Sequence, residues 1–496
     1  MLKIGWSKRD VSTTEPVSIP GQFHMRVSKG IMDPIMLSCL VLDDGNDIVI
    51  FLSGDFVSGG QTIDDIRSKI LKKRTDISIE KIIFHVTHTH CGAGLAKDRR
   101  IDILQPIMNI YPPEKYREFM TDMATEAICE AYDNRQEGYI AYGYGYAVVA
   151  HSRRTRYSDD LSKRPGGECN RTSSLTIDRY VQMYGPTNHE KFVGFEGGAD
   201  HFANFMYTFD KNKKLTGAII NIPCPSQNSG QAWYLSADYW HDVREKIYAK
   251  YGNIGILPQC AAAGDLAPRT LHCFKAEERR YRLKYDANWE DREVFNRKEI
   301  AERISIAFDE VLSWAQKELI SDAKIIHTVK EIQLERLLIT DDQYRLAKEQ
   351  IQELEATGYV HSDDLKTETI NRTTHMVRIK RFEKIIQRYE EQQISQTAGI
   401  ELHVIRIGDI AFATNPFELY IDYQHQIQAR SPFVQTFIVQ LADPPKKYGS
   451  LGYLATDRAM ENLGYSANIY SNSVSPEGGH TLVEETLKEL TDIFKA

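Results

Sequence analysis

Short apolar segments that alternate with helical patterns constrain the fold of this chain more than any other feature. Residues 47–52 (Asp-Ile-Val-Ile-Phe-Leu) and 81–86 (Lys-Ile-Ile-Phe-His-Val) have the length and composition of buried strands. Between them, residues 63–73 carry apolar side chains at helical period. Two strands joined by a helix form a βαβ unit. We therefore expect an α/β fold, in which mixed β-sheets are flanked by helices.

The same alternation of strands and helices is predicted for most of the chain. Further strands are predicted at 140–149, 214–223, 253–258, 403–407, 410–413 and 436–441, and helices at 418–430 and 481–494. Residues 275–395 differ, because they are rich in Glu, Lys, Arg, Gln and Ile, with helical candidates at 297–318, 341–357 and 375–393. A solvated helical layer explains this composition, and a coiled-coil partner surface is the alternative. We expect an α/β catalytic body formed by 1–274 and 396–496, interrupted by a helical insertion or subdomain at 275–395.

The net charge and composition of the chain limit the classes of partner that it is expected to bind. The 496 residues include 61 Lys plus Arg and 69 Asp plus Glu, a net charge of −8, which disfavours nucleic acid as a partner. The start of the chain lacks the pattern of a secretory signal, and no stretch is apolar for long enough to span a membrane. The seven scattered cysteines are typical of reduced thiols. We expect a cytoplasmic protein that binds a soluble small molecule, with no membrane partner; its oligomeric state is not predicted.

Two histidines follow the predicted strand 81–86. His88 and His90 are two residues apart, so strand periodicity places both side chains on one face and His85 on the other. Imidazoles are common zinc ligands, and the small residues of 91–94 allow close approach. The spacing alone is also compatible with solvated rings or with rings bonded to the backbone. The pair is therefore a hypothetical metal site.

Three other segments carry candidate chemistry. The basic residues of 152–156 form either a surface charge run or an arginine clamp for an oxyanion or carboxylate. The small residues of 259–269 form either a tightly packed turn or a loop whose backbone approaches a ligand. Glu418 ends the segment Asn-Pro-Phe-Glu, where it either complements a helix dipole or serves as a ligand or base.

Taken in order, these segments resemble the neutral/alkaline (non-lysosomal) ceramidase family. The motifs are T-H-T-H at 87–90, Arg-Arg at 153–154, A-A-G-D-L-x-P-R at 262–269, P-x-E at 416–418, G-Y-L-x-T at 452–456 and a second G-Y at 464–465. No single motif is decisive, but their order is fairly specific. The resemblance covers most of the chain.

The resemblance implies roles for individual residues. The zinc ligands would be His88, Glu418 and Tyr453, and His90 would lie beside the metal. Tyr465 would stabilise a tetrahedral intermediate, and Arg153 would be the active-site arginine. We also expect Gly21 and Asp265 to bind substrate.

The chain departs from the family at one metal ligand. Pro225 stands where the family has a further histidine ligand, and Ala261 stands where it has a loop serine. Proline offers no ligating side chain. Either another group fills the position, or the metal is weaker, different or absent. The candidates for a replacement are His201, His90, Cys224 and Gln227.

These observations predict a metal-dependent hydrolase, with zinc as the metal. It would cleave an amide or ester bond in a soluble acylated small molecule, such as an acylated sugar or amino sugar. The chain ends soon after Tyr465, which leaves no room for the family's C-terminal β domain, and this favours a soluble substrate over a membrane lipid.

One alternative is a glycoside-cleaving or sugar-modifying enzyme that uses carboxylates such as Glu418, Asp265 and Asp55. In that case Trp233, Tyr234 and Trp240 would stack on the sugar. A third reading is a non-catalytic binding protein with a decayed metal site.

Overall fold

A large mixed sheet forms the centre of the protein. The computed structural model describes residues 1–164, 178–286 and 289–496, so Cys169 lies outside the described residues. In these ranges the sheet has eight strands, with β5 and β6 parallel, β13 and β14 parallel, and the other neighbours antiparallel. Their order is β14 (Gly255–Cys260), β13 (Leu215–Ile222), β12 (Phe202–Asp210), β7 (Gln136–Tyr146), β1 (Lys3–Asp10), β4 (Met36–Asp43), β5 (Ile48–Gly54) and β6 (Ile82–Val86).

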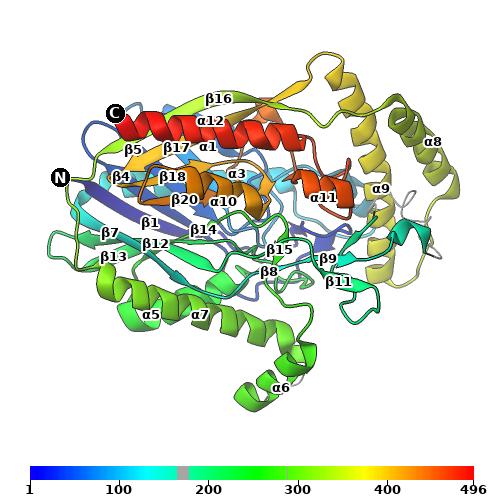
Figure 1. Cartoon of the computed structure of the whole chain (residues 1–496), viewed down its shortest axis with the longest axis horizontal. Coiled ribbons are helices and arrows are strands. Elements are labelled where there is room, and N and C mark those ends of the chain that lie inside the picture. Colours follow the sequence, from blue (N-terminus) through cyan, green and yellow to red (C-terminus); the bar gives the residue numbers. More distant parts are fainter. Residues whose placement is uncertain (165–177, 287–288) are drawn as a thin grey trace.

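A second sheet packs face to face on the first (Figure 1). Its strands, in order, are β16 (Ile325–Glu335), β17 (Thr397–Ile407), β18 (Ile410–Thr414) and β20 (Gln435–Val439). Aliphatic and aromatic side chains from both sheets fill the layer between them. The rings of Phe51 and Phe412, one from each sheet, have centroids 5.2 Å apart. This interlayer core holds the two sheets together by burying apolar surface.

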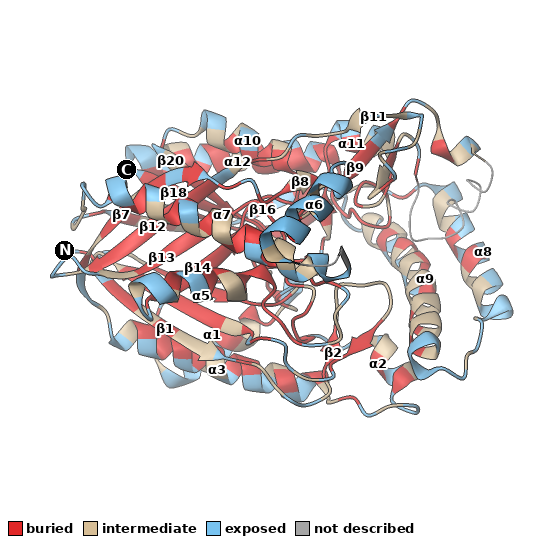
Figure 2. Cartoon of the chain, turned by 90° about the horizontal axis from the view of Figure 1, so that it is seen from below, coloured by how far each residue is buried: buried red, intermediate tan, exposed pale blue. Residues whose placement is uncertain are grey.

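Helices cover the outer faces of both sheets, which gives four layers. The large sheet is covered by α1 (Ile63–Lys73), α3 (Pro113–Asp133), α5 (Tyr239–Tyr251) and α7 (Arg292–Ala315). The second sheet is covered by α10 (Ile421–Arg430) and α12 (Pro476–Lys495). Figure 2 shows buried strands between helices whose outer faces are exposed. The predicted α/β fold is therefore confirmed.

The segment 275–395 divides into three parts. The helices α6 (Phe274–Tyr285) and α7 come first, and α7 packs on the large sheet. The strand β16 follows, and its half-exposed, partly charged sequence explains why it was not recognised among helical candidates. The helices α8 (Asp341–Thr357) and α9 (Leu365–Gln392) pack on each other and connect β16 to β17 at one end of the molecule (Figure 1). The segment is therefore not purely helical; α8 and α9 leave the layered body at one end, and α6 projects from it beside α7 (Figure 1).

Several short elements cluster beyond the sheet ends. The short strands are β2 (Ser18–Ile19), β3 (Arg26–Val27), β8 (His151–Ser152), β9 (Arg154–Tyr157), β10 (Val181–Met183), β11 (Phe192–Phe195), β15 (Leu266–Ala267), β19 (Glu418–Leu419) and β21 (Tyr453–Leu454). The short helices are η1 (Ile79–Lys81), α2 (Arg99–Leu104), η2 (Leu161–Lys163), η3 (Trp289–Asp291), η4 (Lys446–Tyr448) and α11 (Asp457–Asn462).

The carboxyl ends of the parallel strands supply the candidate site. The predicted βαβ unit is present as β5, α1 and β6, and the chain leaves β6 directly into the segment 87–90. The chain likewise leaves β18, which is parallel to β20, towards β19. In open α/β sheets, ligands bind beyond the carboxyl ends of parallel strands.

Two further observations concern the described part of the chain. No helix in it combines the length and apolar character that a membrane span requires. Its six cysteines are all free thiols: five are buried and Cys273 is exposed.

Candidate active site

One pocket collects most of the residues that the sequence singled out. It has a volume of about 400 Å³ and is lined, among others, by Gly21, His88, His90, Arg153, Glu418, Tyr453 and Tyr465. These residues come from loops and strand ends that are far apart in the sequence. The pocket therefore unites the predicted metal ligands with the predicted catalytic groups.

The backbone of His88 is unusual, because its φ is +62°. A left-handed conformation costs a non-glycine residue roughly 1–2 kcal/mol, and such strain is found at functional sites. The Nδ1 atom lies 2.7 Å from the carbonyl oxygen of Val57. Because a carbonyl can only accept, Nδ1 carries a proton, and the other ring nitrogen, Nε2, faces Glu418 and His90.

The Nε2 atom of His88 lies close to two groups that can accept a hydrogen bond. The Nε2 atom of His88 lies 3.3 Å from a carboxylate oxygen of Glu418 and 3.4 Å from Nε2 of His90. Burial tends to raise the pKa of Glu418, but His88 and Arg153 outweigh it and hold that pKa below its ordinary value. Two acceptors at this distance repel unless a proton or a metal cation lies between them. The geometry therefore suits a cation.

Strand pairing places Glu418 beside Tyr453. Glu418 opens β19, which pairs in parallel with β21, and Glu418 is in register with Tyr453. The helix α10 begins only at Ile421, so Glu418 lies before the helix that was predicted to start at 418. In the described ranges no three His, Cys, Asp or Glu side chains form a metal-binding group. The donors that converge are instead a mixed set of imidazole, carboxylate and phenol.

His90 is held from three sides. Its backbone N–H donates to the carbonyl of Ser226 (3.2 Å), and its carbonyl accepts from the guanidinium of buried Arg26 (2.6 Å). Gly21 has a φ of +101°, and a Cβ there would lie 2.8 Å from the His90 ring. Burial, followed by the charges of His88 and Arg26, lowers the pKa of His90 well below its ordinary value. Burial and these charges therefore favour the neutral form of the ring.

Arg153 is a buried cation on the pocket wall. Its guanidinium donates to the carbonyl of Gly264 (2.7 Å) and to the hydroxyl of Tyr453 (3.2 Å). Burial tends to lower the pKa of Arg153, but Tyr453, Tyr184 and Glu418 raise it overall. The neighbouring Arg154 is also buried and donates to the carbonyls of Leu463 (2.7 Å) and Tyr465 (2.9 Å). The basic segment is thus not a surface charge run.

Two tyrosines complete the wall opposite the histidines. The rings of Tyr453 and Tyr465 are 5.8 Å apart in an edge-to-face arrangement, and Phe23 packs edge-on against Tyr465. Burial raises the pKa of both phenols. Both hydroxyls are therefore protonated near pH 7 and can donate hydrogen bonds.

Solved structures were found that resemble this arrangement of layers and loops. The structure described as neutral ceramidase from Pseudomonas aeruginosa aligns with 99% of this chain and 74% of its own, with a TM-score of 0.66 and 15% identity. A structure described as ceramidase complexed with C2 aligns with 100% of this chain and 75% of its own, with a TM-score of 0.64 and 14% identity. The chain has the fold of the neutral ceramidases. No protein-family model matches the sequence, and a search of curated proteins found no match.

Within this neutral-ceramidase fold, the loop that carries Pro225 still packs beside the histidines. The backbone of Ser226 donates to the carbonyl of Thr87 (3.3 Å) and accepts from His90. Pro225 does not line the pocket, whereas Gln227 does, and its amide donates to the hydroxyl of Tyr184 (3.3 Å). The loop therefore contributes an amide side chain to the pocket.

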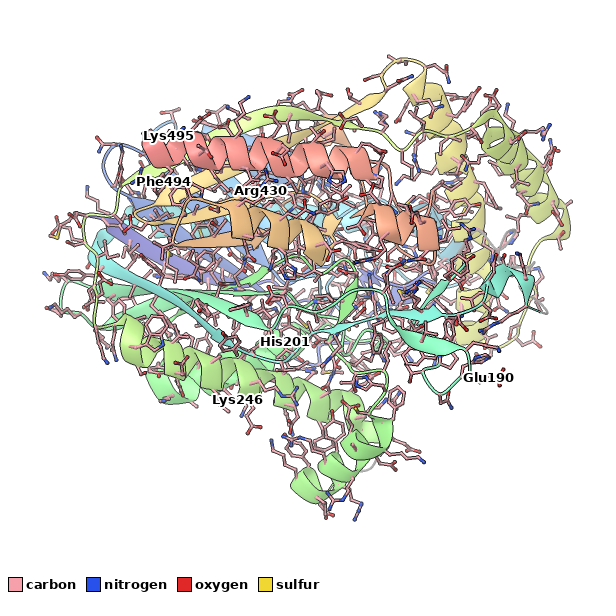
Figure 3. All side chains as sticks on the ribbon, viewed as in Figure 1. Glu190, His201, Lys246, Arg430, Phe494 and Lys495 are labelled. Atoms are coloured by element: carbon pink, nitrogen blue, oxygen red, sulfur yellow. The ribbon has the colours of Figure 1, made fainter. Side chains whose placement is uncertain are left out.

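Two predicted site residues lie elsewhere. Asp265 does not line the pocket; its carboxylate accepts from the first N–H of α10, at Ile421 (3.1 Å), and its carbonyl accepts from Arg153 (3.1 Å). His201, the suggested replacement ligand, precedes β12 (Figure 3) and is also absent from the lining. Its ring lies 6.5 Å from that of His151. Neither Asp265 nor His201 therefore lines the pocket that collects the other predicted site residues.

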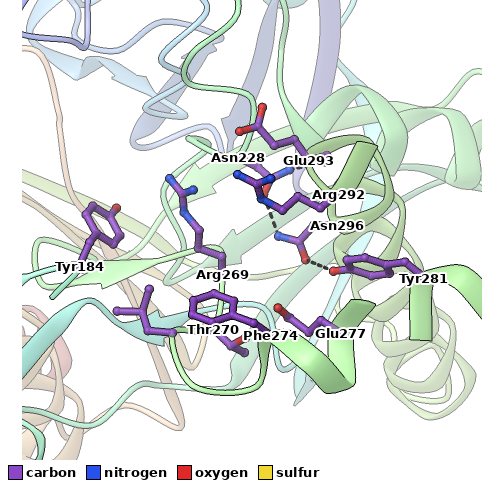
Figure 4. A pocket seen from close by; sticks show the side chains of 11 residues that line it. Tyr184, Asn228, Arg269, Thr270, Phe274, Glu277, Tyr281, Arg292, Glu293 and Asn296 are labelled. Atoms are coloured by element: carbon purple, nitrogen blue, oxygen red, sulfur yellow. Dashed lines mark hydrogen bonds between the residues drawn. The ribbon is translucent and has the colours of Figure 1, made fainter. Parts of the chain in front are cut away.

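An outer chamber of about 620 Å³ adjoins this pocket (Figure 4). Tyr184, Asn228, Arg269 and Glu293 line both spaces, so the chambers are continuous. The outer chamber is also lined by Thr270, Leu271, Phe274, Glu277, Tyr281, Arg292 and Asn296. Asn296 donates to Asn228 (2.7 Å) and accepts from Tyr281 (3.3 Å). Its wall is therefore a mixture of polar groups and aromatic rings.

Sequence reasoning missed several of these residues. Tyr184 and Glu293 lie in no recognisable motif, so no local signal identified them, whereas Gln227 was among the candidate replacement ligands. Arg269 ends the A-A-G-D-L-x-P-R segment, and that position was the available signal. Arg26 is far from His90 in the sequence, but its guanidinium donates a hydrogen bond to the His90 carbonyl. Only its burial and its four carbonyl partners in the structure reveal this role.

Proposed function

We propose that this protein is a zinc-dependent hydrolase that cleaves an amide or ester bond in a soluble acylated small molecule, such as an acylated sugar or amino sugar. The contact between Nε2 of His88 and the carboxylate of Glu418 carries the proposal, since a metal cation held between these two atoms would bind to both. The fold shared with neutral ceramidases supports it.

The residues that would hold zinc are His88, Glu418 and Tyr453. The carbonyl of Val57 fixes the orientation and tautomer of His88, a type of support that metal-ligating histidines commonly receive. Pairing between β19 and β21 fixes Glu418 beside Tyr453. When bound, zinc supplies an activated water and polarises the carbonyl of the substrate.

Arg153 and Tyr465 would stabilise the oxyanion that develops on the substrate carbonyl. Both line the pocket, and Arg153 is already fixed by Gly264 and Tyr453, so little reorganisation is required. Donors of this kind contribute roughly 3–4 kcal/mol each to lowering the barrier. His90, with its neutral ring, would take up a proton and deliver it to the leaving group.

The outer chamber offers a substrate both polar partners and apolar surface. Amides, carboxylates, guanidiniums and aromatic rings line it, and Leu271 is its one aliphatic lining residue among those described. A long alkyl chain would bury these polar groups without partners, at a cost of about 1–3 kcal/mol each. Aromatic rings with amide and acidic groups are well suited to a sugar ring and its hydroxyls.

The glycoside-cleaving alternative finds less support in the pocket. Asp55 is fully buried in an ion pair with Arg244 (2.7 Å), and Trp240 is fully buried in the core. Trp233 and Tyr234 are absent from the lining of both chambers. Glu418 is the one carboxylate of the three suggested for that chemistry that reaches the pocket.

A substrate panel tests the proposal. We expect zinc-loaded protein to hydrolyse N-acyl or O-acyl sugars with a kcat/KM at least roughly 100-fold higher than that for ceramide, because ceramide would leave the polar groups of the outer chamber unpaired. The readout is release of the free acid. The variant Glu418→Gln is the control for contaminating activity and should be inactive. Turnover of aryl glycosides alone would contradict the proposal and favour the alternative.

A further inference from the structure

A second polar cavity lies on the α9 side of the molecule. It has a volume of about 280 Å³ and is enclosed by the C-terminal half of α9, the segment 446–451, Arg336 and Ser473. It shares no lining residue with the catalytic pocket or the outer chamber. Its side chains are therefore not part of the proposed catalytic machinery.

Positive charge dominates this cavity. Its lining includes five cationic side chains and a single carboxylate, that of Glu391; the cations are Arg336, Lys384, Arg388, Lys446 and Lys447. Three of the cations already have carboxylate partners: Arg336 pairs with Glu391, Lys446 with Asp65 and Lys447 with Glu331. Two positive charges, those of Lys384 and Arg388, have no carboxylate partner among the described residues.

The remaining two cations lie one helical turn apart on α9. Arg388 is buried and donates to the carbonyls of Leu337 (2.7 Å) and Ile469, so its position is fixed. Lys384 makes no hydrogen bond or ion pair within the described ranges, although it lines the cavity. Burial and the nearby charges of Arg388 and Arg381 lower the pKa of Lys384 to about 8. The cavity thus lacks about two negative charges.

The segment opposite α9 adds uncharged polar groups. The turn η4 is followed by Gly449, whose φ of +71° turns the backbone, and by Ser450, which also lines the cavity. Ser473 lines the same cavity. A guanidinium, an ammonium and hydroxyl groups around one space are typical of sites that bind phosphate.

We propose that this cavity binds a phosphate-bearing anion, which Lys384 and Arg388 hold at a site separate from the catalytic pocket. Phosphate carries between one and two negative charges near pH 7 and accepts several charge-assisted hydrogen bonds, which matches the two unpaired cations. The volume accommodates a phosphate together with a small attached group. Free phosphate and a phosphate monoester share this chemistry, and the experiment separates them.

Calorimetric titration of the full-length protein tests the site. Inorganic phosphate and glucose 6-phosphate are each titrated near pH 7 at constant ionic strength, which is kept with chloride. We expect one equivalent of at least one probe to bind, and Lys384→Gln to weaken binding at least 10-fold because it removes a charge-assisted contact. The probe that binds more tightly identifies the source of the phosphate.

Two matched variants make the result decisive. Lys384→Arg keeps the charge and should bind within about 3-fold of the wild type. Lys366→Gln removes an exposed lysine from the first turns of the same helix, outside the cavity, and should bind like the wild type. Equal affinity of the wild type and Lys384→Gln, or no binding of either probe at millimolar concentration, would overturn the proposal. Because no hydrolysis is measured, these outcomes are independent of the proposed function.

Discussion

Exchange of His88 for asparagine is expected to lower hydrolysis at least about 1,000-fold and to remove bound zinc. The exchange deletes the Nε2 atom that faces Glu418 and so removes one of the three donors of the proposed site. Asparagine is the appropriate replacement because it tolerates the left-handed backbone that residue 88 adopts. Alanine would add backbone strain at this position, so a loss of activity could come from lower stability as well as from the missing ligand.

The measurements for this variant are zinc content per chain and kcat/KM on the acylated substrate. His361→Asn serves as the control, since His361 is exposed and does not line the pocket. It should retain both zinc and activity. A His88→Asn protein that is folded, holds one zinc and hydrolyses substrate at the wild-type rate would show that the centre is wrongly assigned.

Removal of the Tyr465 hydroxyl should give the second large effect. We expect Tyr465→Phe to lower kcat roughly 100- to 1,000-fold with little change in KM, because the hydroxyl would donate to charge that develops only in the transition state. The ring itself remains, so its contacts with Phe23 and Tyr453 are kept. Steady-state kinetics with zinc-saturated protein separates the two parameters.

Tyr470→Phe is the matched control for this exchange. Tyr470 lies in the same loop region and packs on Phe382 outside the pocket. Its variant should therefore keep the wild-type kcat. If Tyr465→Phe instead raised KM and left kcat unchanged, Tyr465 would bind the substrate without stabilising the transition state.

Local patterns predicted much of the layered body. Apolar runs predicted β5 and β6 because both faces of these strands are buried, and the helical period between them predicted α1 because one face of that helix packs on the sheet. The same reasoning predicted the strand before Glu418, but that strand, β18, ends at Thr414 and Glu418 opens β19. The convergence of His88 and His90 was also predicted, but for an incomplete reason. The rings meet because His88 turns the chain with a positive φ, and β6 has already ended at Val86.

Long-range contacts account for what the sequence did not reveal. Asp265 lies in a recognisable motif, but its carboxylate accepts a hydrogen bond from the first N–H of α10 and does not line the pocket. Arg154 is buried because its guanidinium meets Glu196 and loop carbonyls more than 300 residues away, at Leu463 and Tyr465. The strand β16 is half-exposed and so resembles a solvated helix in composition. Such assignments depend on partners that no local window contains.

Zinc titration of metal-free protein tests the central claim most directly. Chelator-treated protein is titrated with Zn²⁺ while hydrolysis of the acylated sugar is followed. The donor set of His88, Glu418 and Tyr453 predicts that activity appears in proportion to zinc and reaches a plateau at one equivalent. Full activity of the metal-free protein, or no zinc binding by protein that is shown to be folded, would contradict the account.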